Sequence, residues 1–308
     1  MRKAFVKTLI ELAEKDESVY LLTGDLGFHA LEDFALKFPK RFVNCGVAEQ
    51  NMMGIAAGLA MCGKKPYVYS IVSFVTLRCL EQIRNDVCYQ NLDVKIIGIG
   101  GGFSYGTLGA SHSVLEDVAV MRVLPNMTVL CPADLLSTEE LINKSYTTKN
   151  PTYIRISNVG KCEVYSQKPD LQIGETNTIR KGEDGAIIAT GLPVYFSLEI
   201  IDELKKQNIN LKLLDFHTLK PINKDHLLSA VKDFKNIFTI EEHSVIGGTG
   251  SVVAEILAQS DFVGNFKIIG MPDNFLDQVG EADYLRKKYI IKKEEIINNI
   301  LNYFKQKT

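Results

Sequence analysis

The sequence predicts two α/β domains, each built on a mostly parallel, doubly wound sheet. Short apolar strands alternate with helices along most of the 308 residues, a pattern typical of parallel sheets covered on both faces. The alternation stops once, at residues 159–181, which contain Gly160, Pro169, Gly174 and scattered Lys and Asp. The chain length also suits two domains of ordinary size.

The first half of the chain is expected to form eleven elements. In chain order these are helix 2–16, strands 19–25 and 41–46, helix 48–62, strand 65–71, helix 74–90, strand 94–101, helix 113–123, strand 127–134, helix 135–148 and strand 152–158. The first helix places Phe5, Leu9 and Leu12 at helical spacing. Residues 52–63 carry no charge, so helix 48–62 is predicted to be buried on all sides.

The second half repeats the alternation on a smaller scale. Its predicted elements are strand 185–191, helix 195–207, a strand and turn at 211–221, helix 223–233, strand 237–244, helix 249–259, strand 266–272 and helix 292–306. We therefore predict a first domain at residues 1–160, a linker at 161–181 and a second domain at 182–308.

Composition excludes several classes of function. The 35 basic and 37 acidic residues give a formal net charge of -2, so neither nucleic-acid nor membrane-surface binding is expected. The apolar run 52–63 is too short to cross a bilayer, and no secretory signal is expected. The six cysteines form no CxxC pair and suit a cytoplasmic protein. No residue cluster has metal-ligand spacing.

Glu49 is the first candidate functional residue, because it precedes the uncharged run. A carboxylate in the first turn of a helix is commonly stabilised by the helix dipole, by about 0.3–1 kcal/mol. A buried and unpaired carboxylate, in contrast, costs several kcal/mol or stays protonated. A protonated Glu in an apolar pocket can share a proton. The residue alone leaves the structural and functional roles open.

The segment "GGGFSYGTLGASHSVLED" at 100–117 is the second candidate. It joins a strand to a helix, and such connections lie where α/β proteins bind ligands. His112 stands near its end, where a polar helix start with an incidental His is an equally good interpretation. The glycines fit neither GxGxxG nor the P-loop pattern, so they do not indicate a nucleotide by themselves.

The segment "SFVTLRCLEQIRND" at 73–86 is the third candidate. Its apolar stripe is most simply explained as core. Arg78, Gln82 and Arg84 are less expected between core strands, and interface contacts are the alternative explanation.

Together these stretches resemble the transketolase family. "RFVNCGVAEQNMMGIAAGLAMCGKKPYVYSI", "FVTLRCLEQIRND", "GASHSVLEDVAVMRVLPNMTVLCPAD" and "PTYIRI" are similar to its pyrimidine-binding domain. "DFHTLKPI" and "TIEEHSVIGGTGSVVAE" are similar to its C-terminal domain. The order and spacing of the motifs extend over nearly the whole chain, which resembles the C-terminal half of a transketolase made as two polypeptides.

The resemblance implies a thiamine diphosphate enzyme that transfers a two-carbon ketol unit from a ketose to an aldehyde. Glu49 matches the Glu that hydrogen-bonds the aminopyrimidine nitrogen N1′ and activates the cofactor. The other implied site residues are Asp25, Leu26, Phe74 and Arg78 for the cofactor, with Phe74 stacking on the pyrimidine, and His29, His112 and Arg155 for the substrate, with His112 also catalytic.

One half of the family's cofactor site is missing from this sequence. Thiamine enzymes hold the diphosphate through Mg²⁺ or Ca²⁺ bound by a GDG motif and a downstream Asn, and this chain has no GDG. A diphosphate needs a cation and backbone donors. We therefore expect a partner, an N-terminal transketolase subunit with the GDG motif, in a heterotetramer with two copies of each chain.

Two departures from the family pattern concern the substrate. Leu108 stands where many members have an Asp that meets a sugar hydroxyl, and Asn158 stands where many have an Arg for the phosphate. Leu cannot hydrogen-bond, and Asn cannot replace a bidentate cation. An atypical sugar or sugar phosphate is therefore expected.

Three alternatives remain open on the sequence. Two use the same cofactor, namely the beta subunit of a 2-oxo acid dehydrogenase and a 1-deoxyxylulose-phosphate synthase-like enzyme. The third is a non-catalytic regulatory homologue, which the retention of Glu49 argues against.

Overall fold

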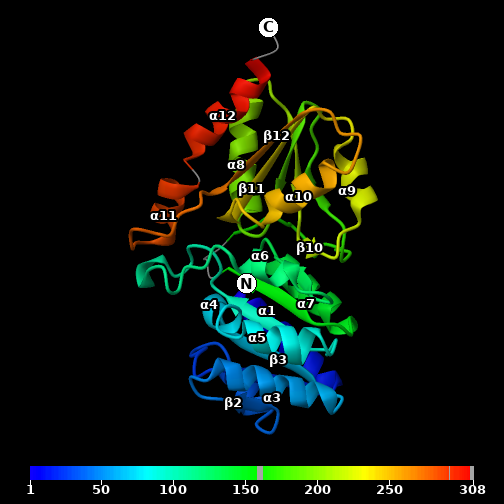
Figure 1. Ribbon diagram of the computed structural model, residues 1–308, viewed down its shortest axis with the longest axis vertical. Coiled ribbons are helices and arrows are strands. Elements are labelled where there is room, and N and C mark those ends of the chain that lie inside the picture. The colour runs from blue at the N-terminus through cyan, green and yellow to red at the C-terminus, as the bar shows by residue number, and fades with distance from the viewer. Residues whose placement is uncertain (158–161, 291, 306–308) are drawn as a thin grey trace.

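The chain forms two α/β bodies stacked along the long axis of the molecule, with the N-terminus near their boundary (Figure 1). This computed structural model describes residues 1–157, 162–290 and 292–305. Within these residues no helix is both long and apolar enough to cross a membrane.

The first domain contains a seven-stranded sheet of order β10-β5-β6-β4-β3-β1-β2. Its strands are β1 Val19–Thr23, β2 Phe42–Asn44, β3 Lys65–Ile71, β4 Lys95–Ile99, β5 Thr128–Leu130, β6 Thr152–Ile156 and β10 Thr218–Lys220. All neighbours are parallel except β10 and β5, so the carboxyl ends of the central strands share one edge.

Helices cover both faces of this sheet. They are α1 Arg2–Lys15, α2 Glu32–Lys37, α3 Glu49–Met61, α4 Val72–Val75, α5 Leu80–Gln82, α6 Asp117–Val123 and α7 Leu135–Thr147, with the π-helix η1 Ile83–Cys88 and the 3₁₀ turn η2 Gly106–Leu108. One core cluster includes residues of α1 and α7, and the other includes residues of α3, η1 and α6. The predicted doubly wound architecture is confirmed.

The second domain contains a five-stranded sheet of order β12-β11-β8-β9-β7. Its strands are β7 Asn177–Arg180, β8 Gly185–Ala189, β9 Leu211–Asp215, β11 Asn236–Ser244 and β12 Asn265–Met271, and its helices are α8 Pro193–Lys205, α9 Lys224–Val231, α10 Thr249–Leu257, α11 Ala282–Tyr289 and α12 Lys293–Lys305. The cluster under α3 and η1 continues to residues of α9 and α10, so the two domains share apolar core.

Two strands lie across the predicted domain boundaries. β7 falls in the predicted linker, yet it pairs with β9 in the second sheet. β10 comes from the second half of the chain and extends the first sheet as its antiparallel edge strand. The domains are therefore joined by main-chain hydrogen bonds as well as by the connecting segment.

The prediction of one helix at 74–90 was wrong. The segment divides into α4, α5 and η1, with a break between Val75 and Leu80. Thr76 Oγ1 donates to the carbonyl of Val72, and Cys79 Sγ donates to that of Phe74. Side-chain bonds of this kind compete with regular helical hydrogen bonding.

The prediction that the helix after Glu49 is buried on all sides was also wrong for this chain alone. Its inner face buries Met52, Met53, Ala56 and Ala57. Its outer face exposes Gly54, Gly58 and Met61. An exposed face of small and apolar residues such as this one can bind another protein surface.

Candidate active site

Glu49 lies in the first turn of α3, at the carboxyl end of the parallel strands. Its side chain is only 1% exposed, and Ser70 Oγ, near the end of β3, donates to Oε1 at 3.3 Å. Gly24 follows β1, and a Cβ there would lie 3.2 Å from the same oxygen. The carboxylate therefore lies at the edge of the sheet where α/β proteins bind ligands.

Arg78 compensates the charge of this buried carboxylate. Its Nη1 donates to Glu49 Oε2 at 2.5 Å, and its guanidinium carbon lies 4.3 Å from the centre of the Phe74 ring. The Arg78 side chain is 41% exposed, so one end of the pair reaches solvent. Burial raises the pKa of the neighbouring Cys79 thiol to about 12, with the Glu49 carboxylate as a second cause, so Cys79 is not a nucleophile here.

Phe74 connects this pair to His112. The two ring centres are 5.1 Å apart in an edge-to-face arrangement, which is a favourable aromatic geometry. Ser111 Oγ lies 3.0 Å from His112 Nδ1. Contacts thus join Glu49, Arg78, Phe74 and His112, from three separate segments of the sequence, into one cluster, called here the Glu49 cluster.

The segment after β1 borders this cluster. Asp25 has a left-handed backbone with φ of 56° and exchanges hydrogen bonds with the Asn44 side chain at 3.0 and 3.1 Å. The carbonyl of Leu26 accepts from Thr23 Oγ1 at 2.9 Å. His29 is exposed, and its backbone N–H donates to Glu32. Asp25 and Leu26 therefore follow the Gly24 that touches Glu49, whereas His29 lies farther along the exposed turn.

Arg155 is placed differently from the other predicted site residues. It is 7% exposed, its Nε donates to Asp117 at 2.8 Å, and its Nη2 donates to the carbonyl of Glu242 at 3.0 Å. The prediction that it contacts substrate stays a prediction, and these contacts favour a role between the domains. Leu108 is 54% exposed on η2, and Asn158 lies outside the described residues.

The Glu49 cluster suits one half of a thiamine diphosphate molecule. A buried carboxylate beside a partly exposed aromatic ring can hydrogen-bond and stack on an aminopyrimidine. The Ser73 hydroxyl is buried beside Phe74 and has no hydrogen-bond partner among the described residues. Within those residues no group of three or more His, Cys, Asp or Glu could hold a metal ion.

Gly24, Ser70 and Ser73 were not predicted as site residues. Gly24 directly follows β1, Ser70 lies near the end of β3 and Ser73 follows β3 by two residues, and these two strands are neighbours in the sheet. Neighbouring strand ends in a parallel sheet were the available signal, because ligand sites form where those ends meet.

Comparison with known proteins finds the same two domains. The family described as transketolase, pyrimidine binding domain, matches residues 1–159. The family described as transketolase, C-terminal domain, matches residues 174–296. A subunit of an apulose-4-phosphate transketolase from Phocaeicola vulgatus is 36% identical over 99% of this chain and 97% of its own length. A 6-deoxy-6-sulfo-D-fructose transketolase subunit from Clostridium sp. MSTE9 is 34% identical over 96% of this chain and 92% of its own length.

A solved structure described as a split gene transketolase, inactive β4 tetramer, is 35% identical and aligns with a TM-score of 0.90 over 100% of this chain and 99% of its own. A 1-deoxy-D-xylulose-5-phosphate synthase from Caldanaerobacter subterraneus is 31% identical, but the match covers 48% of that protein. Full-length agreement with split transketolase subunits favours that interpretation over the synthase.

The Glu49–Arg78 pair makes a prediction about stability. Arg78→Met should lower the free energy of unfolding by about 1–3 kcal/mol, because it leaves a buried carboxylate unpaired next to a partly solvated position. In a Glu49→Gln background the same change should cost less than half as much. Urea unfolding of the four proteins measures this coupling, and Arg84→Met, which removes an exposed Arg bonded only to Asn85 among the described residues, is the control. Equal costs in both backgrounds would contradict the pairing.

Proposed function

Since the chain belongs to the transketolase family, we propose that it is the C-terminal subunit of a two-polypeptide, thiamine diphosphate-dependent transketolase. The enzyme transfers a two-carbon ketol unit from a ketose to an aldehyde. The observation that carries this proposal is the buried Glu49 carboxylate at the carboxyl edge of the sheet. It pairs with Arg78, which lies over Phe74, and Phe74 contacts His112.

Three residues of this chain are assigned to the cofactor's pyrimidine. Thiamine diphosphate, when bound, supplies the carbon nucleophile and the electron sink for breaking a ketose carbon–carbon bond. The Glu49 carboxyl holds and returns the proton at the aminopyrimidine nitrogen, and burial strengthens that shared hydrogen bond. Phe74 would offer a stacking face to the pyrimidine, and Arg78 compensates the charge of the Glu49 carboxylate. Asp25 and Leu26 line the same edge.

His112 is assigned to the substrate. The Ser111 hydroxyl forms a hydrogen bond with Nδ1 of the His112 ring, and we propose that Nε2 binds an oxygen of the ketose. The edge-to-face contact with Phe74 holds the imidazole ring beside the surface on which we place the pyrimidine. His112 therefore lies where it can orient a substrate oxygen and exchange a proton with it. His29 remains a more distant substrate candidate.

A partner subunit completes this proposal. The missing GDG motif and the composition of the Glu49 cluster support a diphosphate and Mg²⁺ site on an N-terminal subunit. The exposed face of α3, with Gly54, Gly58 and Met61, supplies an apolar surface beside Glu49 for that contact. We propose a heterotetramer with two copies of each chain, and an inactive assembly of this chain without its partner, as the similar β4 structure is described.

The substrate is proposed to be an atypical ketose. Two relatives of full length are named for apulose 4-phosphate and 6-deoxy-6-sulfofructose. Leu108 is consistent with this, because it presents an exposed apolar side chain where many transketolases present an Asp. We place the enzyme in the cytoplasm, a location that suits the six free cysteines.

Glu49→Gln should abolish most activity while keeping the fold and the assembly. Gln has the same size and can hydrogen-bond, but it cannot exchange a proton. General acid–base roles contribute about 10²–10⁴-fold, so turnover of the two-subunit enzyme should fall by at least about a hundredfold. Glu81→Gln, on the exposed side of α5, is the matched control. A Glu49→Gln enzyme with more than about a tenth of wild-type turnover would contradict the proton role.

Leu108 should set part of the donor preference. A charged hydrogen bond is worth roughly 1.5–3 kcal/mol, so xylulose 5-phosphate should be about tenfold to a hundredfold less efficient than the best modified ketose. Leu108→Asp should narrow that difference. Steady-state kcat/KM for a panel of ketoses, with and without phosphate or sulfonate, measures it. Xylulose 5-phosphate as the best wild-type donor would refute this interpretation of Leu108.

Gly58 should separate folding from assembly. A Cβ at this position would meet no described residue within 4 Å outside the helix backbone, so Gly58→Ala should leave the isolated chain equally stable or more stable by up to about 1 kcal/mol. Gly58→Leu should weaken assembly with the N-terminal subunit at least about tenfold. Sedimentation of the mixture measures assembly, and Ser229→Leu, at an exposed position of α9, is the control. Equal assembly of both Leu variants would exclude this face.

A further inference from the structure

Glu242 connects the second domain to the glycine-rich segment, defined as residues 100–113. It lies near the end of β11 and is 3% exposed. Its Oε1 accepts from the backbone N–H of Phe103 at 2.7 Å, and its Oε2 accepts from Arg286 Nε on α11 at 2.7 Å. One buried carboxylate thus joins the glycine-rich segment to a helix of the other domain.

The absence of a side chain at Gly102 permits this contact. Gly102 has φ of +71°, and a Cβ there would lie 2.3 Å from Glu242 Oε1. A left-handed conformation and a close approach of this kind both favour glycine. The local sequence is therefore fitted to the incoming carboxylate.

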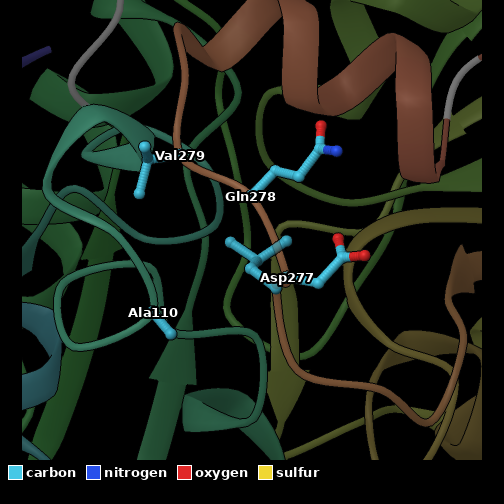
Figure 2. Close-up of a pocket in the computed structure, with 5 residues that line it drawn as sticks. Ala110, Asp277, Gln278 and Val279 are labelled. Carbon is cyan, nitrogen blue, oxygen red and sulfur yellow. The ribbon is translucent and has the colours of Figure 1, made fainter.

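Further contacts from the second domain follow the same segment. The N–H of Gly280 donates to the carbonyl of Gly106 at 3.2 Å, and Leu285 occupies the space where a Cβ on Gly106 would lie. Figure 2 shows the irregular stretch that carries Asp277, Gln278 and Val279 running beside the loop that carries Ala110. The second domain thus contacts the segment along much of its length.

The backbone of Glu242 is also hydrogen-bonded to the first domain. Its backbone carbonyl accepts from Arg155 Nη2 at 3.0 Å, and Arg155 Nε donates to Asp117 at 2.8 Å. Tyr153 OH donates to the same Asp117 oxygen at 2.6 Å. Two buried carboxylates face two buried guanidinium groups, so the interface is charge-compensated and can be rigid rather than strained.

Backbone turns link the Glu242 contact to His112. Gly106 N–H donates to Phe103, Gly109 N–H donates to Gly106, and His112 N–H donates to Gly109, at 2.9, 3.1 and 3.1 Å. The segment contains five glycines in 14 residues, and glycine loses the most backbone freedom on ordering. The three turns connect Phe103 to His112, and a segment this rich in glycine depends on contacts such as that of Glu242 to hold one conformation.

We propose that Glu242 is a positioning residue, through which the second domain fixes the glycine-rich segment and thereby the place of His112. The inference rests on the proposed function for the role of His112, while the anchoring itself is a property of this chain alone. A displacement of about 1 Å in a positioning element can reduce a rate by about a hundredfold. Loss of the Glu242 contact can therefore lower turnover.

The first measurement is hydrogen exchange of peptides within residues 100–113 in the isolated chain. Glu242→Leu alone leaves the buried Arg286 with only the exposed Asp283 as a carboxylate partner and can unfold the protein. The main variant is therefore Glu242→Leu/Arg286→Met, which removes both the acceptor for the Phe103 N–H and the buried guanidinium, and it is checked by thermal unfolding. Exchange at Phe103 and Gly106 should accelerate at least about tenfold. Glu255→Gln is the matched control, because it breaks the bidentate Arg122–Glu255 pair between α6 and α10 and does not touch the segment.

The second measurement is on the two-subunit enzyme. For the main variant, kcat/KM for the best ketose should fall about tenfold or more, while the dissociation constant for thiamine diphosphate stays within about twofold. Exchange and kcat/KM both equal to those of Glu255→Gln would overturn the proposal, and so would accelerated exchange with unchanged kcat/KM. If the wild-type pair transfers no ketol unit, the proposed function fails, and the exchange result alone supports or overturns the anchoring role.

Discussion

A carboxylate buried at the start of an uncharged helix requires compensation, and this constraint shapes the surroundings of Glu49. A buried charge left unpaired costs several kcal/mol. Arg78 supplies the opposite charge, and it reaches Glu49 because the chain breaks its helix between Val75 and Leu80. The same break places Phe74 under the guanidinium and against His112. The contacts that compensate the charge of Glu49 are therefore the same contacts that bring the site residues together.

The region around Glu49 forms only part of a binding site, and the face of α3 beside it is exposed. The Glu49 cluster suits a pyrimidine ring, and the neighbouring face of α3 exposes Gly54, Gly58 and Met61. A buried functional group and an exposed apolar face, side by side on one helix, both call for a second protein surface. The second domain also contributes, because its Glu242 accepts a hydrogen bond from the glycine-rich segment that carries His112.

The sequence predicted the architecture well because its signals are local. Alternating apolar strands and helices indicate the parallel sheets, and the motifs point to Glu49, Phe74, Arg78 and His112, which the structure links by contacts. What it could not predict depends on long-range contacts. β10 crosses to the first sheet, and Arg155 of the first domain donates to the Glu242 carbonyl of the second. The break in helix 74–90 is local instead, because Thr76 and Cys79 donate to carbonyls four and five residues earlier, and the apolar pattern does not reveal such side-chain bonds. Glu242 gives no local signal at all, because its partners lie 139 and 44 residues away.

The central claim is that this chain holds the pyrimidine half of a cofactor site and needs another polypeptide for the diphosphate half. Calorimetric titration of thiamine diphosphate with Mg²⁺ tests it directly, using this chain, an N-terminal transketolase subunit and their mixture. Tight, Mg²⁺-dependent binding is expected only in the mixture, with Glu49→Gln weakening it and Glu81→Gln leaving it unchanged. Tight, Mg²⁺-dependent binding by this chain alone would contradict the account.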